Sequence, residues 1–204
     1  MKLPGLLYKL GVVDVSRIEQ EVLKLTEEQW TEWDLRQKRY VVHSSTETFP
    51  FIFSEYGEPS KTYNHDTEAW NVTSPLIDRL EKFYNRKAGA AILVKLKPYR
   101  DILPHTDAGW FNNTHRVHIP IITDPNIFFS FKKNGAVYKY HLKRGEIYEF
   151  NNLVEHGVTN QTATNRVHLM VDMLPNSVLD PGVQRSRLES IGYSSLEIKE
   201  LLTA

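Results

Sequence analysis

The sequence predicts a mainly β protein with flanking helices, in which the helices pack on a β-sandwich or jelly roll. Two observations support this fold class. Helical periodicity is confined to the beginning and the end of the chain, and short strand-like segments follow one another closely between residues 90 and 173. Helices followed by many closely spaced strands are typical of such folds. The length of 204 residues suits one domain, 1–204, with a single sizeable core.

The beginning of the chain, residues 1–89, is a helical and extended lead-in. Apolar residues recur on one helix face over 14–25, where Ser16 and Glu19 can form a capping box. The next apolar stretch, 35–54, is rich in aromatic and β-branched residues and indicates one or two strands. Residues 55–73 are loop-like.

A clearer helix is predicted over 75–87. Ser74 can cap it, Pro75 suits its first turn, and Gly89 stops it. Its apolar stripe indicates that one face packs on the core.

The predicted β core covers 90–175. Its strands are expected at 90–97, 115–122, 127–132, 136–142, 146–150 and 166–173. Asn134-Gly135 between two aromatic runs is a strong hairpin signal, and Gly145 precedes another strand through a tight turn. The C-terminal extension, residues 176–204, returns to helix, with Ser194 and Glu197 as a second possible capping box.

Composition excludes several classes of function. The 25 basic and 25 acidic residues give no net charge, so we expect no nucleic-acid partner and no anionic membrane surface. No apolar run reaches the roughly 20 residues of a membrane span. The apolar start lacks a cleavage site, which predicts a cytoplasmic protein. Because the chain has no cysteine, any metal must be held by nitrogen and oxygen ligands.

One short motif indicates a metal site. His105 and Asp107 are two residues apart, so on a strand they point to the same side. His156, which follows a predicted strand that leads into a polar loop, is the best candidate for a third ligand. Two histidines and one carboxylate form the facial triad of non-haem Fe(II) oxygenases, which leaves coordination positions open.

Basic and imidazole side chains accompany this predicted triad. Arg166 stands ten residues after His156, and a turn between antiparallel strands would bring it back beside that residue. Its guanidinium can bind a carboxylate through two hydrogen bonds. His168 follows on the same side of the strand and can face the cavity or pack in the core. Arg116 and His118 repeat the same spacing.

These residues resemble the motif of Fe(II)/2-oxoglutarate-dependent dioxygenases. More narrowly, the segments 103–107, 116–120 and 145–156 resemble the aspartyl/asparaginyl β-hydroxylase family. The similarity covers roughly 90–175, about two fifths of the chain. It implies a double-stranded β-helix, a cupin-like variant of the jelly roll. It also implies Fe(II), 2-oxoglutarate and O₂ as cofactor and cosubstrates.

The resemblance also implies roles for individual residues. His105, Asp107 and His156 would hold the iron. Arg166 would bind 2-oxoglutarate, and Arg116 and His118 would contact carboxylates of the cosubstrate or the substrate.

Two departures from the family pattern stand out. The best-known protein-modifying members lack the carboxylate of Asp107, whereas the family's free-proline hydroxylases have it. By analogy, this carboxylate also argues against halogenation. A serine that helps to hold the cosubstrate in the protein-modifying members is replaced near Val94.

The resulting hypothesis is a dioxygenase that hydroxylates a C–H bond of an amino acid or peptidyl residue, proline-like or Asp/Asn, and releases succinate and CO₂. Trp110 and His168 are candidates for substrate contacts. Two alternatives stay open: a non-catalytic jelly-roll module that binds metal or 2-oxoglutarate, and a cupin-type metalloenzyme without 2-oxoglutarate. The substrate, free or within a protein, and the oligomeric state are not predicted.

Overall fold

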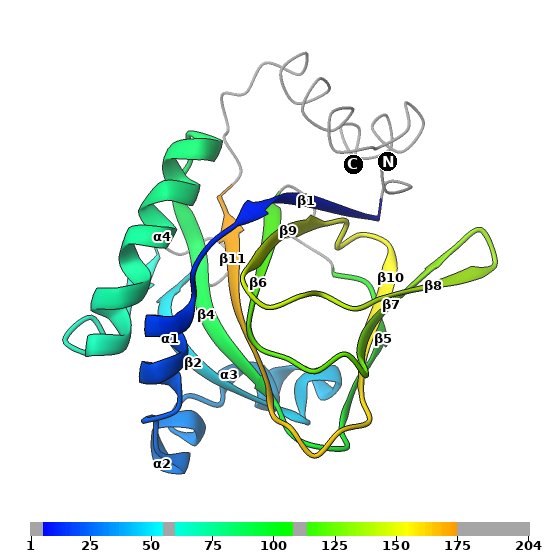
Figure 1. Cartoon of the computed structure of the whole chain (residues 1–204), viewed down its shortest axis with the longest axis horizontal. Helices are drawn as coiled ribbons and strands as arrows, with labels where there is room; N and C mark the ends of the chain where they lie inside the picture. Colours follow the sequence, from blue (N-terminus) through cyan, green and yellow to red (C-terminus); the bar gives the residue numbers. More distant parts are fainter. Residues whose placement is uncertain (1–5, 55–59, 108–113, 175–204) are drawn as a thin grey trace.

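Two antiparallel sheets form the framework of the structure, a computed structural model that describes residues 6–54, 60–107 and 114–174. The strands of the larger sheet, given in spatial order, are β1 (Leu7–Val12), β9 (Glu146–Phe150), β6 (His115–Ile122), β11 (Arg166–Met173), β4 (Ala88–Leu96), β2 (Thr46–Phe53) and β3 (Lys61–Thr62). Those of the smaller sheet are β5 (Asp101–His105), β10 (Glu155–Asn160), β7 (Ile127–Lys133) and β8 (Ala136–Tyr140). The smaller sheet faces the larger one (Figure 1), which confirms the mainly β, jelly-roll class.

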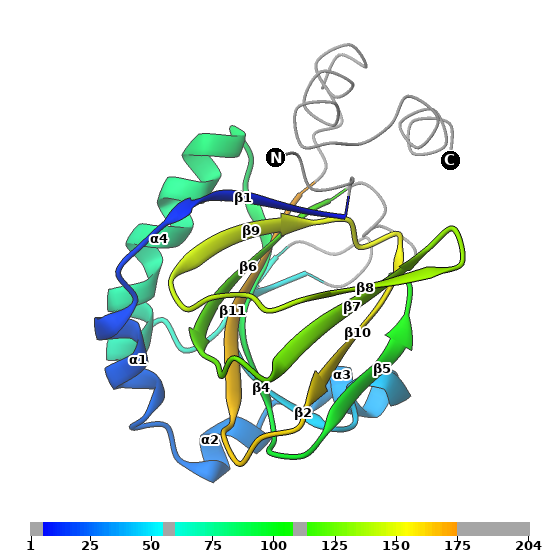
Figure 2. The ribbon, with the colours of Figure 1, turned by 45° about the vertical axis from the view of Figure 1, so that its right-hand side comes forward.

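Helices cover the other face of the larger sheet. Helices α1 (Ser16–Val22) and α4 (Glu68–Tyr84) lie on the side away from the smaller sheet, as Figures 1 and 2 show. The short helices α2 (Glu27–Thr31) and α3 (Leu35–Arg39) contact β2, and the 3₁₀ helix η1 (Val41–His43) contacts β5. Helix α3 and η1 therefore connect one end of the larger sheet with the smaller sheet. In the described part of the chain, no helix is long and apolar enough to cross a membrane.

Alternation along the central strand β11 separates an apolar core from a polar interior. Val167, Leu169 and Val171 belong to the core cluster that packs beneath the helices. The intervening residues Arg166 and His168 point toward the smaller sheet, where both contact Phe129 of β7. Since side chains alternate across a strand, one strand supplies both the packing face and a polar face between the sheets.

The six strands predicted from the sequence are all present as β4, β6, β7, β8, β9 and β11, with small shifts of their ends. The hairpin signal is also confirmed. Asn134 and Gly135 have φ angles of 52° and 77°, as a type I′ turn requires, and they connect β7 to β8. Gly145 has a φ of 73°, and a Cβ there would lie 2.6 Å from the Val13 carbonyl oxygen.

Several predictions for the lead-in are wrong. The stretch 35–54 was expected to be extended, but it begins with α3 and η1, and only β2 is a strand. Its first residues, Leu-Arg-Gln-Lys-Arg, are good helix formers, and this local preference prevails over the apolar residues that follow. The lead-in also contributes β1, which the sequence did not indicate and which pairs with β9.

Both predicted helix starts are also wrong. Helix α4 begins at Glu68, capped by the Thr67 side chain, so Pro75 lies inside the helix and Ser74 does not cap it. The helix ends at Tyr84 with Asn85 in the left-handed conformation, and Gly89 belongs to β4 instead of stopping the helix.

At the first helix, Val15 takes the capping position, and Ser16 bonds to Asp14 instead of forming a capping box with Glu19. The second possible capping box, at Ser194 and Glu197, lies outside the described residues.

Candidate metal centre and anion cavity

The predicted triad comes together between the two sheets. His105 ends β5, Asp107 lies two residues beyond it, and His156 is paired with His105 across the antiparallel β5–β10 ladder. One ligand atom from each of the three side chains lies within 4.8 Å of the others. Among the described residues, this is the one group of three or more such side chains that could hold a metal ion. His156 is on a strand, not in the polar loop where the sequence placed it.

Backbone carbonyls orient both imidazoles. Nδ1 of His105 lies 2.7 Å from the Leu103 carbonyl oxygen, and Nδ1 of His156 lies 2.8 Å from that of Val154. A carbonyl only accepts, so Nδ1 carries a proton in each ring and Nε2 is the nitrogen that remains for a metal ion. Burial lowers the pKa of His156 to about 4, so this imidazole is neutral at pH 7, the form that a metal ion requires.

The carboxylate of the triad is held by a buried ion-pair network. Arg116 Nη1 donates to Asp107, while Nε and Nη2 donate to the two carboxylate oxygens of Asp172 at 2.7 and 2.8 Å. Arg116 and Asp172 face each other across the β6–β11 ladder. Burial alone would raise the pKa of Asp107, but the charge of Arg116 opposes it most strongly, and the pKa lies below its ordinary value. Asp107 is therefore an ionised candidate ligand with one oxygen held in place.

The network bears on the predicted role of Arg116. The guanidinium lines the cavity, but it already contacts two carboxylates of the chain. Its contact with a carboxylate of the cosubstrate or substrate stays a prediction. The position that the structure gives it is beside the triad, where it orients Asp107.

Arg166 lies deep in the same cavity. It is 1% exposed, its Nη2 is 2.8 Å from Nδ1 of His168, and its guanidinium lies over the Phe129 ring at 4.8 Å. Its Nε has no hydrogen-bond partner among the described residues. Burial lowers the pKa of Arg166 to about 9. A buried cation without a carboxylate partner is costly, and a bound anion would offset that cost.

His118 is a second buried group whose polar atoms lack partners. Neither of its ring nitrogens has a hydrogen-bond partner in the described part of the chain, although the residue is only 7% exposed. Its ring contacts Phe150, Phe129 and His168. Burial, followed by the charge of Arg166, holds the pKa of His118 well below its ordinary value. Buried polar groups are almost always hydrogen-bonded, so the two nitrogens of His118 are open hydrogen-bonding positions in the cavity.

Three further residues, two of them predicted to contact the substrate, lie as follows. His168 faces the cavity side of β11 and bonds to Arg166, which places it behind that residue. Trp110 lies outside the described residues. His115 of β6 pairs with Glu149 at 2.5 Å.

Sequence reasoning missed two cavity residues. Arg36 of α3 and His43 of η1 line the cavity together with the triad histidines. His43 packs against His105 with ring centroids 5.4 Å apart. Neither residue belongs to a motif, and the segment that carries them was expected to be extended. The one available signal was an arginine in an otherwise amphipathic stretch.

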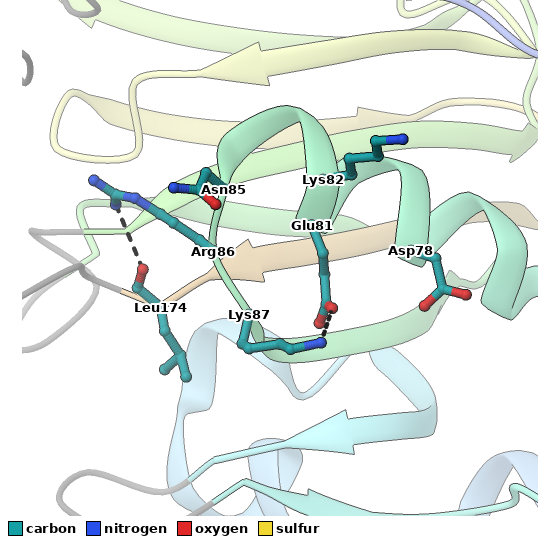
Figure 3. A pocket seen from close by; sticks show the side chains of 7 residues that line it. All are labelled: Asp78, Glu81, Lys82, Asn85, Arg86, Lys87 and Leu174. Carbon is teal, nitrogen blue, oxygen red and sulfur yellow. Dashed lines mark hydrogen bonds and ion pairs between the residues drawn. The ribbon is translucent and has the colours of Figure 1, made fainter.

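A separate hollow of about 680 Å³ lies at the end of α4 (Figure 3), apart from the triad. Lys87 pairs with Glu81 at 2.6 Å there, and Arg86 donates to the Leu174 carbonyl oxygen. None of the triad residues lines this hollow, so we assign the chemistry to the cavity between the sheets.

Comparison with known proteins yields one family match. A family model described as aspartyl/asparaginyl beta-hydroxylase matches residues 13–175, which include every described residue of the triad and the cavity. A search of curated protein sequences found no relative.

Solved structures share the fold at low sequence identity. A 2OG-Fe(II) oxygenase family oxidoreductase from Burkholderia pseudomallei is 13% identical, with a TM-score of 0.53 and coverage of 63% of this chain and 66% of that one. The chain thus spans just under two thirds of that protein. A prolyl-4-hydroxylase from Pseudomonas putida is 10% identical (TM-score 0.52, coverage 84% and 93%). The α-ketoglutarate-dependent epimerase SnoN of nogalamycin biosynthesis is also 10% identical (TM-score 0.52, coverage 83% and 77%).

Proposed function

Since the chain belongs to the aspartyl/asparaginyl β-hydroxylase family, we propose that it hydroxylates a C–H bond of an amino acid or a peptidyl residue, with Fe(II), 2-oxoglutarate and O₂. The observation that carries the proposal is the convergence of two imidazoles and one carboxylate near a buried arginine that has no carboxylate partner among the described residues. Proline-like residues and Asp or Asn residues are the substrate classes that we propose.

The donor set fits Fe(II). Nε2 of His105, Nε2 of His156 and one oxygen of Asp107 would hold the ion, and two nitrogens with one oxygen are suited to non-haem iron. Bound iron supplies the activation of O₂ that the protein side chains cannot perform. The two backbone carbonyls and Arg116 fix the three ligands, and such outer partners tune affinity by 10- to 100-fold in other metal sites.

The donors near Arg166 support 2-oxoglutarate as the cosubstrate. Arg166 would bind the carboxylate at its far end, and the partnerless Nε supports this assignment because it is one more donor for an anion. His118, located between Arg166 and the triad in the chain of ring contacts, can donate one hydrogen bond to the same molecule. Val94 lines this cavity, where a protein-modifying relative would carry serine, so Arg166 and His118 would hold the cosubstrate without that hydroxyl.

The protein's own contribution is positioning and the exclusion of water. Phe129 and Phe150 form one wall and Val158 and Met170 contribute to the lining, so the polar groups act in a desolvated space. In such a space, charge-assisted hydrogen bonds orient a dicarboxylate more strongly than they do in water.

Succinate release tests this proposal. The purified protein, incubated under air with Fe(II) and 2-oxoglutarate, should form succinate faster when the right amino acid or peptide is added. For each additional succinate formed in its presence, the added compound should gain one oxygen atom. Mass spectrometry with ¹⁸O₂ measures this gain. If 2-oxoglutarate binds but neither succinate nor a hydroxylated product forms with any free amino acid or any Pro-, Asp- or Asn-containing peptide, the chain is a binding module and the proposal is wrong.

A further inference from the structure

Arg36 and His43 form a second polar pair in the cavity that the proposed chemistry does not use. Arg36 lies on α3 and is 7% exposed, and its Nη2 lies 3.1 Å from Nε2 of His43. Its Nη1 has no hydrogen-bond partner among the described residues. Burial lowers the pKa of Arg36 to about 10, so the side chain is a cation at pH 7.

The hydrogen bond between the two residues determines what the pair can bind. A guanidinium has donors only, so Nε2 of His43 accepts and Nδ1 of the same ring carries the proton. That Nδ1 also has no partner in the described part of the chain. The pair therefore holds two buried N–H donors without acceptors, Nη1 of Arg36 and Nδ1 of His43. Two donors and a positive charge match a carboxylate.

The pair contacts the triad through His105, whereas the proposed 2-oxoglutarate site is connected to the triad through Phe150 and His156. A continuous series of contacts connects the pair to that site, and the ring centroids of successive aromatic members are 4.5 to 5.7 Å apart. Its members, in order, are Arg36, His43, His105, His156, Phe150, His118, His168 and Arg166. The metal-ligand histidines lie within the series, so each arginine flanks them from its own end, paired with a histidine of its own.

A count of the buried charges indicates that the cavity lacks one negative charge. Three buried guanidiniums line the cavity, those of Arg36, Arg116 and Arg166. Two buried carboxylates, Asp107 and Asp172, are bonded to Arg116. Fe(II) and the 2-oxoglutarate dianion would cancel each other, which leaves one positive charge unmatched. Since an unmatched buried charge is costly, a third carboxylate would complete the site.

We propose that Arg36 and His43 bind a carboxylate of the substrate and so select substrates that carry one. The carboxylate is either the free α-carboxylate of an amino acid or the side chain of an aspartyl residue. This inference rests on the proposed function, because it assumes that the substrate is bound beside the triad. It identifies two specificity-determining residues that lie outside the metal-binding motif, on α3 and η1.

Binding measurements without O₂ test the proposal independently of turnover. The probes are L-amino acids paired with their amides, L-proline with L-prolinamide first, and an N-acetylated, C-amidated Asp peptide paired with the Asn peptide. Each pair differs in a carboxylate. Isothermal titration of the anaerobic protein loaded with Fe(II) and 2-oxoglutarate should show one carboxylate probe binding at least about tenfold more tightly than its amide. The pair that discriminates identifies the source of the carboxylate.

Arg36→Gln should then weaken the binding of that carboxylate probe by about 30-fold or more, while the amide binds nearly as before. Arg36→Lys should restore part of the discrimination because it keeps the charge and loses the planar fork. His43→Phe keeps the ring that packs on His105 and should lose a smaller part. The matched control is Arg39→Gln, an exposed arginine on the same helix, which should bind the probe like the unmodified chain.

The outcomes separate this inference from the proposed function. If 2-oxoglutarate binds and no carboxylate probe binds better than its amide, the inference is wrong and the proposed function stands. The same conclusion follows if Arg36→Gln discriminates as well as the unmodified chain. If the protein binds no 2-oxoglutarate in the presence of Fe(II), the proposed function is wrong, and the inference that rests on it is wrong as well. The comparison of probe pairs with the unmodified protein stands even if the Arg36 variants do not fold.

Discussion

His156→Ala is expected to abolish Fe(II) binding while the rest of the fold remains. The substitution removes one of three ligands from a strand whose ladders to β5 and β7 are made by the backbone and are kept. Loss of an outer partner alone costs 10- to 100-fold in affinity at comparable sites, so loss of a direct ligand should weaken binding by more than about 100-fold. Anaerobic titration with Fe(II), or with Co(II) as a coloured substitute, measures the loss.

The control for this variant is another histidine that also has a backbone partner. His65 contacts the Phe51 carbonyl oxygen and stacks on Trp70, away from the triad. His65→Gln should bind Fe(II) like the unmodified chain. If His156→Ala retained the metal affinity of the control while folding normally, the proposed ligand set would be wrong.

Arg166→Ala is expected to raise the dissociation constant for 2-oxoglutarate by at least about 30-fold, with Fe(II) binding unchanged. Removing one partner of a buried charge pair costs about 2–5 kcal/mol, and each 1.4 kcal/mol is a factor of ten. Arg166 contacts no triad residue in any hydrogen bond or ion pair that the described residues show, so the metal ligands should keep their geometry. Anaerobic titration with 2-oxoglutarate at saturating Fe(II) measures the effect.

Arg166→Lys separates charge from geometry at the same position. The lysine keeps the positive charge, but it cannot form two parallel hydrogen bonds to a carboxylate, so an intermediate loss of affinity is expected. Equal 2-oxoglutarate affinity in the alanine variant and the unmodified protein would contradict the proposed role of Arg166.

The sequence was sufficient where a local pattern determines the structure. Asn134-Gly135 requires the positive φ angles of a tight hairpin, and the strands β6, β9 and β11 appear within a residue of the predicted positions. The His-x-Asp spacing places two ligands on one side of the chain whatever the fold. These features depend only on residues close together in the chain, so they can be predicted from the sequence of this chain alone.

The sequence was insufficient where distant contacts decide. The five residues of α3 favour a helix, but the aromatic and β-branched residues that follow them led to the expectation of an extended segment, and Arg36 and His43 were missed with it. Asp172 follows an apolar run and has no sequence motif around it, yet its carboxylate accepts hydrogen bonds from Arg116 across the β6–β11 ladder. The third ligand, His156, was found by its place after a strand, but its position on β10 depends on the register with β5.

The central claim is that one cavity binds Fe(II) through His105, Asp107 and His156 and 2-oxoglutarate at the same ion. Anaerobic titration of the Fe(II)-loaded protein with 2-oxoglutarate, followed by visible absorption, tests it most directly. We expect a weak charge-transfer band that saturates at one 2-oxoglutarate per iron and is absent in His156→Ala. Iron binding without such a band at any 2-oxoglutarate concentration would contradict the account.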